Sequence, residues 1–273
     1  MKTVDHMLIL DVDGVISSLK EKKARPEILE YVAEKLRNGK PVAFNTGRSL
    51  DWVVTRAGKT LIDNPGIKKF LKNLIIVGEK GGTWMTFDDE GRPQEHVDES
   101  ISVSSDLQVD IQNLITTKYS ESMFYDSPKK TMSSSEMKDG YDMNKYAQDQ
   151  KLLIPQVEEI IKRYGLENIL EIEPNPIALD VQNRNVGKDL GIKRILNWLK
   201  ACKIKVLSFT TIGDSPSDIK MAQELKKNNF SVRHVHVGKK GVHNGLYPFE
   251  VITTKKEYDE GADEFLKGSA FRS

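Results

Sequence analysis

Short apolar runs alternate with amphipathic helices along this chain, and this alternation restricts the fold more than any other feature. The first part contains buried strands at 7–10, 41–45 and 74–77, with helices predicted to begin at Pro26 and just after Ser49. Strands that alternate with helices in this way predict a parallel sheet. In such sheets ligands bind beyond the carboxyl ends of the strands, where each of these three runs meets polar residues.

The alternation stops near Gly81 and returns near residue 187. The intervening residues predict helices and antiparallel strands, namely a β-like stretch 84–87, a helix 106–118, a β-like stretch 129–135, a loop 136–150, a helix 155–164 and a hairpin over 168–182. The later alternating elements are predicted at 188–201, 205–212, 217–226, 232–237, 249–253 and 255–267. We therefore predict an α/β protein, with a parallel-sheet core at 1–82 and 187–273 and an inserted α+β domain at 83–186.

Composition excludes several classes of partner. The formal net charge is +1, from 41 basic and 40 acidic residues, so the molecule as a whole attracts neither nucleic acid nor anionic membranes. The lone Cys202 makes no intramolecular disulfide, and the apolar run at 7–10 is too short for a signal peptide or a membrane span. We expect a soluble cytoplasmic protein that acts on a small molecule.

The first acidic cluster directly follows the first strand. Asp11 and Asp13 leave the strand end together, and Gly14 lets the backbone turn sharply. The spacing does not fit a calcium loop, whose twelfth position requires glutamate but here is Lys22. Taken alone, the cluster is explained equally well by a turn with two solvated acids.

A second acidic cluster follows a later strand. Asp214 stands at the strand end and Asp218 lies four residues on, where helix capping by Asp214 or Ser215 is the alternative explanation. On one sheet edge, however, the two clusters would repel each other, by roughly 4 kcal/mol for two charges about 4 Å apart at an effective dielectric constant near 20. A set of oxygen ligands without histidine or cysteine favours Mg²⁺ as the ion that offsets this repulsion.

Two further segments fit the binding of a phosphoryl group. Thr46, Gly47 and Arg48 follow the second strand, so the Thr46 hydroxyl and the backbone N–H groups of this turn can hold phosphoryl oxygens. Lys188 opens the helix after the insert, where it can neutralise phosphate charge and restrain a carboxylate. Each segment alone is also typical of an ordinary protein surface.

The order DVDGV, TGRS, a lysine and GDSPSD resembles the haloacid dehalogenase superfamily of phosphohydrolases along the whole chain. The position of the insert resembles that of members with a C2-type cap, which include Cof-like and sucrose-phosphatase-like sugar phosphatases. The resemblance implies a Rossmann-like core and a Mg²⁺-dependent phosphatase acting on a small phosphorylated metabolite, with a sugar phosphate as the expected substrate.

The resemblance also implies a role for each matching residue. Asp11 would be the nucleophile and Asp13 the general acid and base. Mg²⁺ would be held by Asp11, Asp214 and the backbone carbonyl of Asp13, with Asp218 in support. Thr46 and Lys188 would bind the phosphoryl group, alongside Gly47 and Arg48.

One local departure concerns the end of the third strand. Lys80 stands where many relatives carry asparagine, and we hypothesise that it contacts an anionic group of the substrate; a solvated hinge lysine is the alternative. Candidates for substrate contacts from the insert are Lys129, Lys130, Ser133, Asn175, Asp180 and Asn183.

Three histidines form a separate cluster. His234 and His236 alternate on a strand, with His243 nearby, a spacing compatible with a zinc site. They lie outside all the motifs, so we interpret the pair as part of a half-buried strand face. Two alternatives to the phosphatase remain from sequence alone: a phosphomutase of the phosphomannomutase type, and a non-catalytic protein that binds a sugar phosphate.

Overall fold

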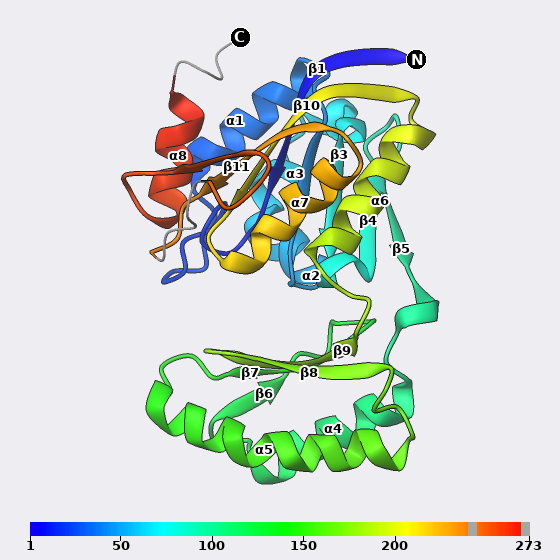
Figure 1. The fold of residues 1–273 in the computed structure, drawn as a ribbon, viewed down its shortest axis with the longest axis vertical. Helices are drawn as coiled ribbons and strands as arrows, with labels where there is room; N and C mark the ends of the chain where they lie inside the picture. The colour runs from blue at the N-terminus through cyan, green and yellow to red at the C-terminus, as the bar shows by residue number, and fades with distance from the viewer. Residues whose placement is uncertain (240–244, 269–273) are drawn as a thin grey trace. The chain divides into compact units, whose positions relative to one another are not determined.

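A computed structural model describes residues 1–239 and 245–268 (Figure 1). The chain forms two compact units. The larger unit combines Met1–His96 with the residues from Gly187 onward, and the smaller unit comprises Val97–Val186.

The larger unit is built on an eight-stranded sheet with the order β12-β11-β10-β1-β2-β3-β4-β5. The first six strands in this order are parallel, with bounds β12 (Glu250–Thr253), β11 (Ser231–His236), β10 (Ile204–Gly213), β1 (Lys2–Leu10), β2 (Val42–Asn45) and β3 (Leu74–Gly78). Strand β4 (Thr83–Phe87) runs antiparallel to β3, and β5 (Pro93–Val97) forms the edge. The chain moves outward from β1 in both directions, which makes the carboxyl ends of β1 and β10 the crevice where such folds bind ligands.

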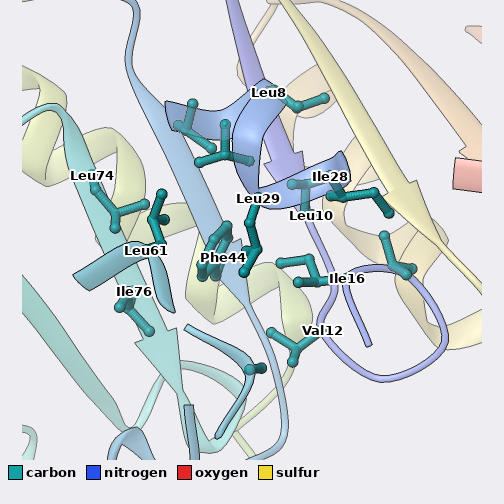
Figure 2. Packing of buried hydrophobic residues seen from close by; sticks show 14 of the residues in the cluster. Leu8, Leu10, Val12, Ile16, Ile28, Leu29, Phe44, Leu61, Leu74 and Ile76 are labelled. Carbon is teal, nitrogen blue, oxygen red and sulfur yellow. The ribbon is translucent and has the colours of Figure 1, made fainter. Parts of the chain in front are cut away.

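Helices cover both faces of this sheet (Figure 1). Helices α1 (Pro26–Arg37) and α8 (Tyr258–Lys267) share one hydrophobic cluster with Leu8 and Leu10 of β1. Helices α6 (Lys188–Ala201) and α7 (Ile219–Lys227) share the opposite cluster with Met7 and Ile9. Successive strand residues point to opposite faces, so the apolar second half of β1, Met7 to Leu10, is buried on both sides. Figure 2 shows the first cluster around Phe44.

The segment after β2 is less regular than the single helix expected from Ser49 to residue 62. Ser49 is the predicted N-cap, and its Oγ accepts a hydrogen bond from the N–H of Trp52 at 3.2 Å. The segment then passes through α2 (Leu50–Trp52), a π-helical turn (Val53–Ala57) and α3 (Lys59–Ile62). Short 3₁₀ turns lie at Lys68–Asn73, Glu79–Gly81 and Pro216–Asp218.

The smaller unit packs two helices on a four-stranded antiparallel sheet with the order β6-β7-β9-β8. Its strands are β6 (Met123–Tyr125), β7 (Ser133–Met137), β8 (Leu170–Asn175) and β9 (Ala178–Asn183). Its helices are α4 (Ser105–Lys118) and α5 (Met143–Arg163), preceded by a 3₁₀ turn at Glu99–Ile101. Leu179 and Val181 of β9 pack in one apolar core with both helices.

The predicted class, a mostly parallel α/β core with an inserted antiparallel α+β unit, is confirmed, but several bounds differ. Strand β1 begins at Lys2 and not at residue 7, and β7 spans Ser133–Met137 where a β-like stretch was expected over 129–135. Strands β4 and β5 belong to the larger sheet, so the smaller unit begins at Val97 and not at residue 83. The expected loop 136–150 contains the first turns of α5, where the Asp142 side chain caps the helix by accepting from the N–H groups of Asn144 and Lys145 at 2.9 Å each. Pro155 lies inside this helix and does not start it. Among the described helices, none combines the length and the apolar character needed to cross a bilayer.

Candidate active site

Asp11 follows β1 directly and is held by neighbouring strands. Its N–H donates to the carbonyl of Ile212 at 2.9 Å, which extends the ladder between β1 and β10 by one residue. The Lys188 ammonium lies 2.6 Å from Asp11 Oδ1, and both side chains are almost fully buried. A buried carboxylate paired with a buried ammonium therefore lies at the carboxyl end of the central strand.

Lys188 connects three elements through its ammonium. Besides Asp11, it contacts Asp218 Oδ1 at 2.9 Å and donates to the backbone carbonyl of Asn45 at 2.7 Å. The Asn45 side chain in turn donates to the carbonyl of Lys188 at 2.9 Å. Because α6 approaches so closely, a Cβ at Gly191 would lie 2.2 Å from Asn45 Oδ1. Sequence reasoning missed Asn45, although its place at a buried strand end, just before Thr46, was the available signal.

Asp218 is fully buried at the start of the helical segment after β10. Its Oδ2 accepts from the N–H and from the hydroxyl of Ser215, at 3.0 and 2.7 Å, and the two residues form a capping box. The helix-capping alternative considered for this cluster is therefore real. Capping uses one carboxylate oxygen and leaves the other facing Lys188.

Asp214 lies against the turn that follows Asp11. Gly14 has a φ of +69°, and a Cβ added there would lie 2.6 Å from Asp214 Oδ2. Glycine is thus required at position 14 both by its backbone conformation and by the closeness of this carboxylate.

One oxygen from each of Asp11, Asp214 and Asp218 lies within 4.8 Å of the others. Burial, followed by the charge of Asp218, raises the pKa of Asp11 well above its usual value, with Lys188 acting in the opposite direction. The same two causes raise the pKa of Asp214 to about 7. For Asp218 burial opposes ionisation, but Lys188 and Ser215 outweigh it and lower the pKa. Three converging carboxylates with oxygen donors alone fit a hard divalent cation, which would relieve their repulsion.

Asp13 is not one of these three carboxylates, and its side chain faces Arg48. The guanidinium holds the carboxylate through two hydrogen bonds, Nε to Oδ2 at 2.9 Å and Nη2 to Oδ1 at 3.2 Å. Arg48 itself stacks 4.8 Å above the ring of Trp52, a residue that sequence reasoning had not singled out. This fork fixes the orientation of the Asp13 carboxylate. The expected metal contact of Asp13 is through its backbone carbonyl and stays a prediction.

Thr46 and Gly47 form the turn after β2. The N–H of Thr46 donates to the carbonyl of Val77 at 2.9 Å, and its hydroxyl accepts from the N–H of Arg48 at 3.2 Å. Lys80 lies over this turn, with its Cε 3.4 Å from the position that a Cβ of Gly47 would occupy. The larger unit therefore brings together Asp11, Asp13, Thr46, Gly47, Arg48, Lys80, Lys188, Asp214 and Asp218 at one sheet edge.

The candidates from the insert belong to the smaller unit. Lys129 is buried, with its ammonium 2.8 Å from Ser134 Oγ and 3.2 Å from Asp180 Oδ1. Burial lowers the pKa of Lys129, but the charges of Asp180 and Asp126 outweigh burial and raise it overall. Lys130 is exposed. Ser133 is buried opposite Val181, on the strand face that belongs to the apolar core.

Two asparagines of the insert have local structural roles. Asn175 Oδ1 accepts from the N–H groups of Ile177 and Ala178, which closes the turn between β8 and β9. Asn183 Oδ1 accepts from the N–H of Asn185 at 3.0 Å. A contact of either side chain with substrate stays a prediction.

His234 and His236 lie on β11, and both side chains are buried. The Nδ1 of His234 is 2.8 Å from Thr211 Oγ1, and the two rings lie 6.4 Å apart between centroids. Burial lowers the pKa of His234 to about 4. These contacts suit a packed strand face, fully buried where a half-buried one was expected; His243 lies outside the described residues.

Comparison with solved structures finds the same fold at low sequence identity. The C-terminal domain of C. albicans trehalose-6-phosphate phosphatase aligns over 96% of this chain and 91% of that chain, with 11% identity and a TM-score of 0.64. A haloacid dehalogenase-like hydrolase from Bacteroides thetaiotaomicron covers 87% and 90%, with 12% identity and a TM-score of 0.60. The sucrose-phosphatase of Synechocystis sp. PCC6803, in complex with sucrose and phosphate, aligns over the full length of both chains, with 15% identity and a TM-score of 0.55.

Comparison with curated protein sequences finds no match. The family comparison, in contrast, covers most of the chain: residues 8–229 match the haloacid dehalogenase-like hydrolases. That span includes the acidic turn after β1, the turn after β2, Lys188 and both later aspartates. This protein belongs to the haloacid dehalogenase-like hydrolase family.

Proposed function

We propose that this hydrolase is a Mg²⁺-dependent phosphatase that releases phosphate from a small phosphorylated metabolite, a sugar phosphate, in the cytoplasm. The observation that carries the proposal is the contact of 2.6 Å between Lys188 and Asp11, inside a group of three carboxylates at the carboxyl ends of β1 and β10. A carboxylate held in this way is fixed in place as a nucleophile. The solved phosphatases with the same fold act on phosphorylated disaccharides by their names, which supports the choice of substrate class.

The reaction begins when an Asp11 oxygen attacks the phosphorus. The bond from phosphorus to the alcohol oxygen breaks, and Asp13 gives its proton to that leaving oxygen. In the second step Asp13 takes a proton from water, the water oxygen attacks the phosphorus, and the bond to Asp11 breaks. Inorganic phosphate leaves, Asp11 is again a free carboxylate, and Asp13 again carries the proton with which it began.

The other residues hold the phosphoryl group and its charge. The Thr46 hydroxyl and the backbone N–H groups of the turn would bind phosphoryl oxygens, and Lys188 would balance the negative charge that develops on them. Arg48 keeps the Asp13 carboxylate in one orientation through its two hydrogen bonds. Mg²⁺, held by Asp11, Asp214 and the Asp13 carbonyl with Asp218 in support, would supply charge neutralisation at the same oxygens.

The test is phosphate release from a panel of esters with and without Mg²⁺, comparing wild type with Asp11→Asn. The panel holds sugar monophosphates, phosphorylated disaccharides, phosphoglycolate, nucleotides and an aryl phosphate. We expect Mg²⁺-dependent release that Asp11→Asn abolishes. An isomerised sugar phosphate without free phosphate would indicate a mutase instead. Binding of a sugar phosphate without turnover of any ester would indicate a non-catalytic binding protein.

A further inference from the structure

Asn45, the last residue of β2, makes a reciprocal contact with Lys188. Its backbone carbonyl accepts a hydrogen bond from the Lys188 ammonium at 2.7 Å, and its side-chain amide donates to the backbone carbonyl of Lys188 at 2.9 Å. Both residues are buried, and they are 143 positions apart in the sequence. One residue of β2 therefore holds both ends of Lys188, its backbone at the start of α6 and the tip of its side chain.

The Lys188 ammonium has one acceptor for each of its three N–H donors. These acceptors are Asp11 Oδ1 at 2.6 Å, Asp218 Oδ1 at 2.9 Å and the Asn45 carbonyl. Contacts in three directions locate the nitrogen in space. Of the three, the contact from Asn45 comes from a neutral group, so it places the ammonium without changing the charge of the site.

The position of this ammonium sets the orientation of Asp11. Asp11 Oδ1 also accepts a hydrogen bond from the N–H of Val12 at 2.7 Å, so one carboxylate oxygen is held from two sides. A carboxylate is planar and rigid, and a shift of the ammonium that pulls on Oδ1 therefore turns Oδ2 as well. In the proposed mechanism this carboxylate attacks phosphorus, and misplacing reacting groups by about 1 Å can lower a rate about 100-fold.

The Asn45 amide packs closely against α6. A Cβ at Gly191 would overlap the amide oxygen, and it would lie 2.7 Å from the amide nitrogen. Gly191 lies inside α6, with its N–H bonded to the carbonyl of Gly187 at 3.2 Å. The close approach of Asn45 accounts for a glycine at a helical position where alanine would otherwise be favoured.

We infer that Asn45 is a positioning residue, which holds the Lys188 ammonium in place and, through it, the Asp11 carboxylate. The inference rests on the proposed phosphatase function and adds to it a residue outside the four segments that resemble the family motifs. Asn45 acts through Lys188 and not on the substrate. Its loss should therefore affect the rate of the chemical step more than the binding of the ester.

The first test compares Asn45→Ala with a matched control, Asn73→Ala. Asn73 is also a buried asparagine of the larger unit, and its amide donates to the backbone carbonyl of Leu36 at 3.0 Å. On the ester that wild type hydrolyses fastest, Asn45→Ala should lower kcat about 10-fold to 100-fold and change KM less than about 3-fold. Asn73→Ala should change kcat less than about 3-fold, because the hydrogen bond that it removes lies outside the site. Equal changes of kcat in the two variants would overturn the inference.

Gly191→Ala disturbs the same amide from the side of α6, and it serves as a second variant should Asn45→Ala fail to fold. As a single change it should lower kcat about 10-fold or more, because the added methyl group displaces the Asn45 amide. In the Asn45→Ala background the methyl group has space, and Gly191→Ala should lower kcat no further. A single variant with the kcat of wild type would overturn the inference, as would a further loss in the double variant.

A measurement on the ammonium itself keeps this test separate from that of the proposed function. In protein whose lysine side chains carry the heavy isotope of nitrogen, a buried ammonium held by three acceptors exchanges its protons slowly and gives a proton–nitrogen NMR signal. Comparison with Lys188→Met identifies the signal of Lys188. We expect this signal to shift, or to broaden by exchange with water, in Asn45→Ala and to stay in place in Asn73→Ala.

That NMR result supports the positioning of Lys188 by Asn45 even if no ester is hydrolysed, an outcome that would refute only the phosphatase. A Lys188 signal that is the same in Asn45→Ala as in wild type overturns the inference, whatever the activity.

Discussion

Replacing Lys188 by methionine removes the ammonium that lies between Asp11 and Asp218 while keeping the length of the side chain. Both carboxylates are buried, and Lys188 is their partner at 2.6 and 2.9 Å. Breaking a buried ion pair by removing one partner costs about 3–5 kcal/mol, because the remaining charge is desolvated and uncompensated. We therefore expect Lys188→Met to lower the free energy of unfolding of the larger unit by about 3–5 kcal/mol at pH 7 without divalent cations.

The chain provides a convenient assay and a matched control. Its three tryptophans, Trp52, Trp84 and Trp198, all lie in the larger unit, so urea unfolding followed by tryptophan fluorescence reports on that unit. Lys193 is exposed on the same helix, and Lys193→Met should change the free energy of unfolding by less than about 0.5 kcal/mol.

Mg²⁺ gives the experiment a second readout. A cation bound by the folded state alone stabilises it by about 2.7 kcal/mol at a concentration 100 times its Kd, so Mg²⁺ should recover part of the loss in Lys188→Met. A Lys188→Met variant as stable as Lys193→Met without Mg²⁺ would refute the reasoning, because the two carboxylates would then not depend on Lys188.

Three further predictions concern the metal, the acid and the pH dependence. Gly14→Ala should weaken Mg²⁺ binding at least about 10-fold in calorimetric titration, because the added Cβ would lie 2.6 Å from Asp214 Oδ2. The control is Gly165→Ala, at a residue with a similar φ of +66° but with open space around the added Cβ. Equal Mg²⁺ affinities in the two variants would contradict the steric argument. Arg48→Lys keeps the charge but cannot make both hydrogen bonds to the Asp13 carboxylate. In steady-state assays kcat should therefore fall about 10-fold or more, with KM less affected. An unchanged kcat would show that Arg48 does not position Asp13. Burial, followed by the charges of Arg233 and Lys35, lowers the pKa of His6 to about 4. Between pH 6.5 and 4 the unfolded state therefore binds a proton that the folded state does not, and the free energy of unfolding should fall by about 3 kcal/mol as the pH drops across this range. Urea midpoints of His6→Gln should fall less steeply than those of wild type over the same range, and parallel curves would show that His6 is not responsible.

Much of the core could be predicted from the sequence because its signals are local. The second half of β1 and the strands β2 and β3 are short apolar runs, and helices α1 and α6 carry regular apolar faces. The edge strand β5 is largely exposed and polar, so no apolar pattern marks it, and this explains the misplaced boundary of the insert. The first two turns of α5 are also polar and give no apolar pattern. Pro155 was therefore taken as the start of a helix that begins at Met143.

Some parts of the candidate site could likewise be predicted from the sequence, and others could not. The acidic residues could be predicted because they follow strands whose carboxyl ends meet at one edge. Lys188 could also be expected beside a carboxylate, because it opens the helix after the insert. Its contact with the Asn45 carbonyl and the hydrogen bonds from Arg48 to Asp13 could not be predicted, since they depend on helix and turn positions that no short pattern encodes. The left-handed conformation of Lys80 likewise needs the tertiary hydrogen bonds that hold it.

The central claim is that Asp11 carries the phosphoryl group during turnover, and the most direct test is to trap that group. The enzyme would be quenched in acid during turnover of its best ester, an acyl phosphate reduced with borohydride, and the peptides mapped by mass. The account predicts homoserine at position 11 in wild type and none in Asp11→Asn. Steady phosphate release with residue 11 recovered only as aspartate, or with homoserine at another position, would contradict it.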